Sequence, residues 1–411
     1  MATIAASRTR AATHSSPSRL QSRVQSVDVL RGIVMVIMAL DHIRDFFHHD
    51  SQLFSPEDLT KTSAMLFFTR WMTHFCAPVF VFLAGTGSYL ATRRGMSRAA
   101  VSRFLVTRGL WLIVVEMTLV LFGSTFNLSY QFVIWQVIWA IGWSMIALSV
   151  LVYLPWRALF VFSVAMIAAH HAFDGLSSSQ LGSFDWIWKI LHEGLSAVSL
   201  PGGVTALVIY PLIPWIGVMS AGYCFGRIFD LEPHRRRALM LQIGLALSAA
   251  FVALRFLNVY GDPSPWSTQP TALITALSFL RTSKYPPSLL FLLMTLGPSL
   301  IALSVLDRVR VGDRHPLLVY GRVPLFYYVL HWYLLHLVAV GFAWMRYGRV
   351  DFLFALPPAL SPSPSGFPQG YGYDLWVVYL VWAAIVAALY PPCRWFADVK
   401  ARKRSRVLSY F

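Results

Sequence analysis

Long runs of apolar residues constrain this 411-residue chain more than any other feature. A helix needs roughly 20 apolar residues to cross about 30 Å of hydrocarbon. Segments of that kind lie at residues 27–47, 73–92, 104–123, 130–152, 156–171, 203–229, 238–258, 287–306, 317–342 and 373–392. Since backbone groups in lipid must be hydrogen-bonded within their own segment, we expect an all-α, polytopic bundle of about ten transmembrane helices. The fifth segment is short and Pro211 and Pro214 interrupt the sixth, so a count of nine or eleven stays open.

The composition excludes several other classes of protein. Hydrophobic residues make up 57% of the chain and charged residues only 13%, whereas a soluble chain has about 25% charged residues. A soluble globular enzyme and a disordered chain are therefore excluded. The three cysteines, Cys76, Cys224 and Cys393, are too few for a disulfide-stapled fold and sit in or beside apolar runs.

The net charge of +16 bears on how the chain is oriented in a membrane. The basic residues lie in short runs between apolar blocks, which favours a lipid bilayer over nucleic acid as the partner. With ten spans, one side receives the most basic connections and both termini, and we assign that side to the cytoplasm. The expected organisation is a basic cytoplasmic tail at 1–26, a transmembrane domain at 27–392 and a second basic tail at 393–411.

Ionisable residues cluster at the outer end of the first span. Asp41 and Asp45 are one helical turn apart and share a face, while His42 points about 100° away. An imidazole beside a carboxylate is a usual arrangement for a general base, so we expect His42 and His74 as acid/base residues with Asp41 or Asp45 orienting them. The further candidates in the following loop are His48 and His49. The alternative is that these groups simply lie at the level of the lipid headgroups.

Other polar residues fall deeper in the spans. Glu116 lies near the middle of the third segment and must be protonated or paired. Tyr327 and His331 are four residues apart and share a face of the ninth segment, whereas His331 and His336 diverge by about 140°. This divergence argues against a pair of metal ligands, and we expect no metal site.

At the cytoplasmic end of the first span, Asp28 and Arg31 are three residues apart on one helical face. They could form a local ion pair at the start of a helix. They could equally help to hold a ligand that carries phosphate. The residues themselves leave both readings open.

Several strings in the chain resemble a known family. They are R-x-x-S-x-D-x-x-R-G at 23–32, THFCAPVFVFLAG at 73–85, SKYPPSLLFLLMTLGP at 283–298, GRVPLFYYVLH at 321–331 and LYPPCRWFADVKARKR at 389–404. The first resembles the start of the membrane domain of heparan-alpha-glucosaminide N-acetyltransferase, and the others look like its bacterial relatives. The resemblance implies a polytopic acyltransferase that takes an acetyl group from cytoplasmic acetyl-CoA and delivers it to an amino sugar, or to another hydroxyl or amine, on the outer side.

The resemblance also implies a catalytic histidine near the outer end of the first span or in the loop after it. That region offers His42, His48, His49 and, across the loop, His74. The chain departs from the lysosomal enzyme by carrying His42 where that enzyme has Asn, and by a longer, unrelated loop. His48 or His49 could therefore be the positional counterpart of the catalytic residue.

A polyanionic donor such as acetyl-CoA must keep its phosphates at the basic face. Arg31, Arg108 and Arg322 lie at that face on three different spans and are expected phosphate ligands. The other expected coenzyme contacts are Asp28, Tyr327 and His331. Each arginine taken alone is better explained as a positive-inside residue without a ligand.

Two alternatives to an enzyme stay open. A transporter or exporter of a small molecule would also carry polar groups inside its spans, and a structural membrane subunit would use such groups to join helices. The expected partners are the bilayer and a small-molecule or glycan acceptor, with no nucleic acid, and a homo-oligomer is left open. The bacterial-looking strings favour the cytoplasmic (inner) membrane of a bacterium.

Overall fold

The computed structural model describes residues 24–92, 95–356, 360, 366–403, 405 and 408. Residues 1–23 of the expected N-terminal tail lie outside this part, and so does most of the C-terminal tail beyond residue 403. The last helix, however, continues to Arg402, so the segment after residue 392 begins as helix.

Within the described residues, eight helical stretches are long and apolar enough to cross a membrane, and each overlaps one of the predicted segments. They are α2 with α3 (Ala64–Thr73, Cys76–Thr92), α4 with η2 and α5 (Arg98–Val115, Glu116–Val120, Leu121–Thr125), α7 with η3 (Trp156–Ala169, His170–Phe173), α9 with η6 (Leu212–Phe225, Gly226–Asp230), α10 (Pro233–Leu257), α12 (Leu289–Leu306), α14 (Pro324–Tyr347) and α15 (Leu375–Arg402). The helical membrane protein expected from the sequence is thereby confirmed. The count of ten spans and the side of the termini stay predictions.

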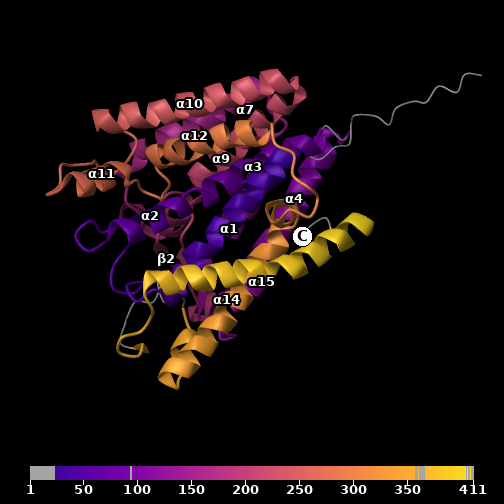
Figure 1. Cartoon of the computed structure of the whole chain (residues 1–411). Coiled ribbons are helices and arrows are strands. Elements are labelled where there is room, and N and C mark those ends of the chain that lie inside the picture. Colours follow the sequence, from indigo (N-terminus) through magenta and orange to yellow (C-terminus); the bar gives the residue numbers. More distant parts are fainter. Residues whose placement is uncertain are drawn as a thin grey trace, which may run out of the picture.

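The two remaining predicted segments form helices of a different character. α1 (Gln25–Phe47) is long but carries charged residues at both ends, and α6 (Val137–Leu151) is apolar but short. α1 lies in the middle of the molecule beside α3 (Figure 1). α10, α12, α7 and α9 lie on one side of it, and α14 and α15 on the other.

A small sheet departs from the all-α expectation. Its strands are β1 (Phe132–Trp135), β2 (Ser196–Ser199) and β3 (Thr205–Val208), in the order β1-β3-β2. β1 and β3 are parallel, with Phe132 opposite Thr205, and β2 is antiparallel to β3. Two predicted spans were therefore too long at their starts, because 130–152 and 203–229 each combine a strand with a helix.

The sheet positions the helices that follow it. β1 leads into α6 after Gln136, and β3 leads into α9 after Pro211, whose fixed φ suits the start of a helix. Since parallel strands end at the same edge, their pairing sets the beginnings of α6 and α9 side by side. The edge where they end faces the outer cavity described below.

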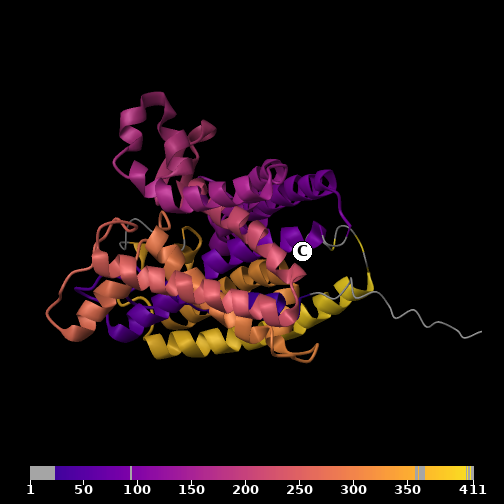
Figure 2. The ribbon, with the colours of Figure 1, turned by 90° about the horizontal axis from the view of Figure 1, so that it is seen from above.

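Short elements fill the connections. They are η4 (Ser178–Phe184), α8 (Asp185–Leu191), η5 (Pro201–Gly203), α11 (Ala272–Leu280), α13 (Pro316–Arg322) and η7 (Asp351–Leu353). The short helices between α7 and α9 stand out from the bundle as a lobe (Figure 2).

Pairs of glycines bring four sets of helices into backbone contact. At each crossing, a methyl group on either glycine would meet backbone atoms of the partner helix. Small residues allow such close approach, which helps helices to associate in lipid. The pairs are Gly32 with Gly321 (α1 and α13), Gly85 with Gly222 (α3 and α9), Gly109 with Gly142 (α4 and α6), and Gly244 with Gly297 (α10 and α12).

Candidate active site

A cavity of about 470 Å³ surrounds the end of α1 that carries His42, and we call it the outer cavity. Its wall comes from α1, the loop at 48–63, the end of α2, the loop at 281–288 and the edge of the sheet. The polar lining residues are Asp41, His42, Arg44, Asp45, Ser51, Gln52, Ser55, Glu57, Arg70, Thr73, Gln136, Tyr210, Lys284 and Tyr285.

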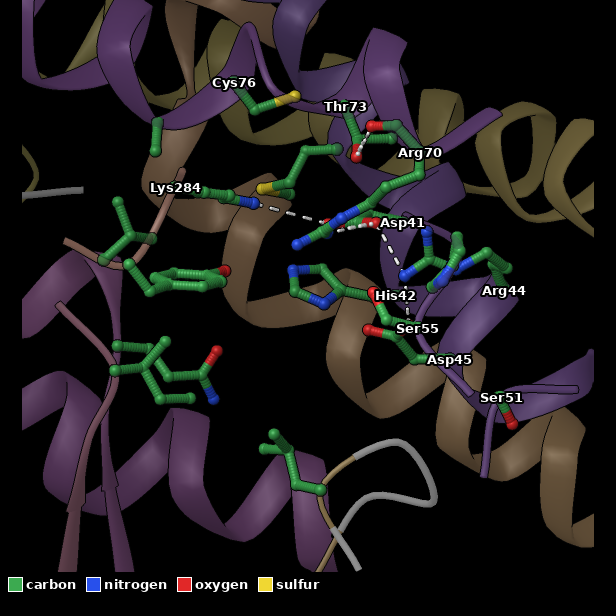
Figure 3. A pocket seen from close by; sticks show the side chains of 18 of the residues that line it. Asp41, His42, Arg44, Asp45, Ser51, Ser55, Arg70, Thr73, Cys76 and Lys284 are labelled. Carbon is green, nitrogen blue, oxygen red and sulfur yellow. Dashed lines mark hydrogen bonds and ion pairs between the residues drawn. The ribbon is translucent and has the colours of Figure 1, made fainter. Parts of the chain in front are cut away.

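His42 points into the outer cavity (Figure 3). Its ring lies 4.2 Å from the ring of Trp332 and 5.3 Å from that of His331, measured between centroids. No side chain or backbone group in the described part of the chain forms a hydrogen bond with the His42 ring. Packing against Trp332 therefore orients the imidazole, and its nitrogens are available to a molecule in the cavity.

Asp41 lies beside His42 but is held by three cations. Nη1 of Arg70 donates to both carboxylate oxygens at 2.9 and 2.6 Å, Nη2 of Arg44 lies 3.1 Å from Oδ1, and Nζ of Lys284 lies 3.8 Å from Oδ2. All four side chains are buried. Asp41 thus lies at the centre of a buried cluster of three cations and offsets part of their charge (Figure 3).

Asp45 also contacts an arginine. Nη2 of Arg44 donates to Oδ1 of Asp45 at 2.5 Å, and the Asp45 side chain is about one-quarter exposed, at 24%. Both carboxylates expected to orient His42 are therefore engaged with guanidinium groups.

His74 lies behind the cavity wall rather than in it. Its side chain is 1% exposed, its Nε2 is 3.0 Å from Oε1 of Glu57, and its ring packs against Phe291. Glu57 lines the cavity. Burial raises the pKa of Glu57, but His74, Arg70 and Lys284 outweigh this effect and hold the pKa at about 2, so that Glu57 is ionised at neutral pH.

His48 and His49 join the end of α1 to the segment before α15. His48 forms a β-bridge with Tyr373, the backbone N–H of His49 donates to the Tyr373 carbonyl at 3.1 Å, and the two imidazole rings stack at 4.5 Å. Nδ1 of His49 lies 2.8 Å from a carboxylate oxygen of Asp50. Of the groups that the structure describes, His48, His49 and Asp50 bring donor atoms within 4.8 Å of one another, a spacing that a metal ion could use.

A second cavity, of about 290 Å³, surrounds the other end of α1, and we call it the inner cavity. It brings together the three arginines singled out from the sequence, Arg31 of α1, Arg108 of α4 and Arg322 of α13, with Lys400 of α15. The rest of its wall is largely apolar. A cationic rim over an apolar wall suits a ligand with phosphates at one end and an uncharged arm.

Asp28 holds Arg31 in place. Nη1 of Arg31 donates to Oδ1 of Asp28 at 3.1 Å and to the carbonyl of Gly321 at 3.3 Å. Arg322 donates to Oδ1 of Asp313 at 2.6 Å. Neighbouring groups thus position Arg31 and Arg322 in the wall of the inner cavity.

Tyr327 and His331 are fully buried on α14 between these regions. Nδ1 of His331 contacts the carbonyl of Tyr328, which can only accept, so Nδ1 carries the proton. Nε2 of His331 is then an acceptor, and it has no hydrogen-bond partner in the described part of the chain. Tyr328, rather than Tyr327, lines the inner cavity.

The two cavities adjoin. Phe80 of α3 and Val137, the first residue of α6, line both of them. Glu116 accepts hydrogen bonds from backbone N–H groups at the start of α6, including that of Ile138, and so caps the helix that carries Val137. This cap pairs part of the buried carboxyl, whose Oε2 has no hydrogen-bond partner in the described part of the chain.

Several residues at the site were not singled out in the sequence. Glu57, Lys284, Tyr285 and Tyr210 lie in connections whose position depends on the fold, and Arg70 lies near the end of α2. Burial raises the pKa of Tyr285, but Lys284 and Arg70 outweigh it and lower the pKa below its ordinary value. The SKYPP run at 283–287 is the sequence feature that could have pointed to Lys284 and Tyr285.

Comparison with known proteins identifies a family to which the chain is similar. A family model described as heparan-alpha-glucosaminide N-acetyltransferase, catalytic, matches residues 23–261, which is more than half of the chain. The matched region contains α1, the loop at 48–63 and the junction of the two cavities. A search of curated proteins finds no match to the chain.

Proposed function

Because the chain belongs to the heparan-alpha-glucosaminide N-acetyltransferase catalytic family, a family of membrane N-acetyltransferases, we propose that it is an acyl-CoA-dependent acyltransferase. It would move an acetyl group from cytoplasmic acetyl-CoA to an amino sugar, or to another amine or hydroxyl, on the outer side. The observation that carries the proposal is that two adjacent cavities, one lined by arginines and one containing His42, share Phe80 and Val137 in their walls.

The inner cavity would hold the donor. Arg31, Arg108 and Arg322 supply guanidinium groups for the phosphates, and the apolar wall accepts the pantetheine arm. Arg31 and His42 are eleven residues apart on α1, a rise of about 16 Å along the helix axis. An extended pantetheine arm can cover that distance, so the thioester would reach the junction of the cavities.

The outer cavity would hold the acceptor and carry out the transfer. In direct transfer, the acceptor amine attacks the thioester carbonyl, His42 takes the proton from the attacking nitrogen, the C–N bond forms, the C–S bond breaks, and CoA leaves as a thiolate that is then protonated. In the two-step alternative, a ring nitrogen of His42 attacks the thioester carbonyl and the C–S bond breaks, so that CoA leaves as a thiolate that is then protonated. The acceptor amine next attacks the acetyl-imidazole, and its C–N bond to acetyl forms as the bond to His42 breaks and the amine proton passes to the released imidazole. Lys284 and Tyr285 line the same cavity and are the donors for the oxyanion in either route.

The apolar helices and the family support a multi-pass integral membrane protein. We place it in the cytoplasmic membrane of a bacterium, with the inner cavity on the cytoplasmic side. The basic connections on that side support this orientation.

The test uses the full chain purified into lipid nanodiscs. Release of CoA from acetyl-CoA and formation of N-acetyl product are measured with a panel of amino sugars, for the natural protein and for His42→Ala, Arg322→Met and Arg349→Met. Arg349 pairs with Asp351 on the exposed outer surface and serves as the control. His42→Ala should abolish transfer while retaining CoA binding, and Arg322→Met should weaken CoA binding.

Full activity of His42→Ala would refute the role of His42. If no acceptor causes release of CoA, and intact sugar passes across the membrane of sealed vesicles, the protein is a transporter and the proposed acyltransferase activity is refuted.

A further inference from the structure

A second imidazole lies behind His42, and the proposed reaction does not yet use it. The ring of His331 on α14 lies 5.3 Å from the ring of His42, measured between centroids. His331 is fully buried and lines neither the outer nor the inner cavity. It can therefore act on a molecule in the site only through a neighbouring side chain. Of the described aromatic rings beside it, three belong to its own helix and His42 comes from α1.

His331 has one buried nitrogen that can only accept a hydrogen bond. Its Nδ1 contacts the carbonyl of Tyr328 and carries the proton, so Nε2 is a bare acceptor, and no described residue donates to it. Leaving such an acceptor unpaired in a buried site is costly. A centroid separation of 5.3 Å lets one nitrogen of each ring reach hydrogen-bond distance after a small rotation of the His42 ring. Catalytic hydrogen bonds are often poorly aligned until substrate binds.

His42, for its part, lacks the partner that usually orients a catalytic imidazole. That partner is most often a carboxylate, which holds one ring N–H and leaves the other nitrogen bare. Here the carboxylates of Asp41 and Asp45 are engaged with guanidinium groups. Packing against Trp332 sets the plane of the His42 ring but does not decide which nitrogen carries the proton. An acceptor outside the cavity is needed for that choice, and Nε2 of His331 is one.

We propose that His331 is the positioning residue for His42. Nε2 of His331 accepts a hydrogen bond from one nitrogen of His42, so that the other nitrogen is without a proton and faces the outer cavity. When that nitrogen takes a proton from the acceptor amine, the imidazolium keeps its hydrogen bond to His331. The same proton then passes from His42 to the thiolate sulfur of CoA. This inference rests on the proposed function and adds to it a residue that acts through the base.

Two substitutions separate the acceptor from the packing of His331. Glutamine places its side-chain oxygen near the position of Nε2, so His331→Gln retains an acceptor for His42. Asparagine places its amide nitrogen near the position of Nδ1, so His331→Asn retains the donor to the Tyr328 carbonyl but lacks the acceptor. Both variants leave Asp41 and its cations unchanged.

His336→Asn is the matched control. His336 is fully buried on the same helix, and its Nδ1 lies 3.1 Å from the carbonyl of Gly123. Its Nε2 also has no partner among the described residues. The His336 ring, however, stacks on Phe126 at 4.0 Å and has no contact with His42 among the described ring pairs. The control thus removes a similar imidazole from the same helix without touching the base.

The first measurement is the kinetics of the full chain in nanodiscs, with glucosamine as acceptor. His331→Asn should lower kcat about 10- to 100-fold while KM for acetyl-CoA is unchanged, because one hydrogen bond to the base is lost. His331→Gln should recover most of that loss, and His336→Asn should retain the natural kcat. A merely structural role of His331 would affect the Asn and Gln variants alike.

The second measurement does not need turnover. Nitrogen NMR of the full chain, isotopically labelled in its histidine rings, reports which nitrogen of His42 carries the proton, and the His42 signals are those lost in His42→Ala. The natural protein and His331→Gln should show one tautomer of His42, and His331→Asn should show a mixture of two.

Equal kcat in His331→Asn and the natural protein, equal losses in the Asn and Gln variants, or mixed His42 tautomers in the natural protein would overturn the positioning role. If the natural protein acetylates glucosamine, these results leave the proposed function intact. Conversely, a single His42 tautomer that depends on His331, in a protein that never releases CoA, would retain the pairing and refute the acyltransferase.

Discussion

The substitution Asp41→Asn tests the energetics of the outer cavity. It removes a negative charge that contacts the buried side chains of Arg70, Arg44 and Lys284, of which Arg44 keeps its contact with Asp45. Loss of one partner from a buried ion pair costs about 3–5 kcal/mol, because an unpaired charge remains in a poorly solvated site. Asp41 serves three cations, so we expect a loss at the upper end of that range. Thermal unfolding of the full chain in nanodiscs, followed by tryptophan fluorescence, would measure it.

The matched control is Asp351→Asn, which breaks an ion pair with Arg349 whose two partners are both more than half exposed. An exposed pair of this kind contributes little to stability, because solvent screens its charges. A second substitution, Lys284→Met, should recover part of the loss in the Asp41→Asn background, since it removes one of the uncompensated cations. Equal destabilisation by Asp41→Asn and Asp351→Asn, or no recovery in the double variant, would refute the assignment of Asp41 as the counter-ion of the cluster.

Three further outcomes are expected. Gly32→Ala places a methyl group in the backbone of α13 and should prevent accumulation of folded protein on size-exclusion chromatography, whereas Gly341→Ala, in open space on α14, should be neutral or stabilising by up to about 1 kcal/mol. Val137→Phe narrows the junction of the cavities and should lower the acetyl transfer rate about 100-fold while CoA binding, measured by calorimetry, persists. Burial and the adjacent His49 lower the pKa of His48 from 6.5 to about 4, so on acidification the unfolded chain binds a proton at this residue before the folded chain does. The free energy of unfolding should therefore be highest above pH 6.5 and should fall by about 2 kcal/mol at pH 5. His48→Gln should remove this dependence of the melting temperature on pH.

The helical bundle could be predicted because its helices coincide with long apolar runs in the sequence. The sheet could not, because the four-residue strands at 132–135 and 205–208 are as apolar as the helices that follow them. Four residues are too few to show the alternation of polar and apolar residues that marks a strand, when an apolar helix follows directly. Only Gln136 and Pro211, at the starts of the helices, marked the change.

The candidate site was predictable in part for a similar reason. Arg31 and His42 lie on one helix, where spacing determines relative position. Lys284 approaches Asp41 across 243 residues of sequence, and no local pattern predicts such a contact. Whether a carboxylate faces an imidazole or a guanidinium also depends on the packing of separate helices, which is why Asp45 was assigned to His42 from its position alone and is found with Arg44.

The backbone contact between α1 and α13 fixes the separation of Arg31 and Arg322, since each arginine directly adjoins a glycine of that crossing. Side chains at an ordinary helix interface can adjust to ligands of different length by changing rotamers, but two backbones in contact have no such latitude. In the proposed donor site, the tolerance for polyanions of different phosphate spacing would therefore be narrow. Selectivity among nucleotide thioesters would be governed by Gly32 and Gly321, two residues with no side chain to offer the ligand.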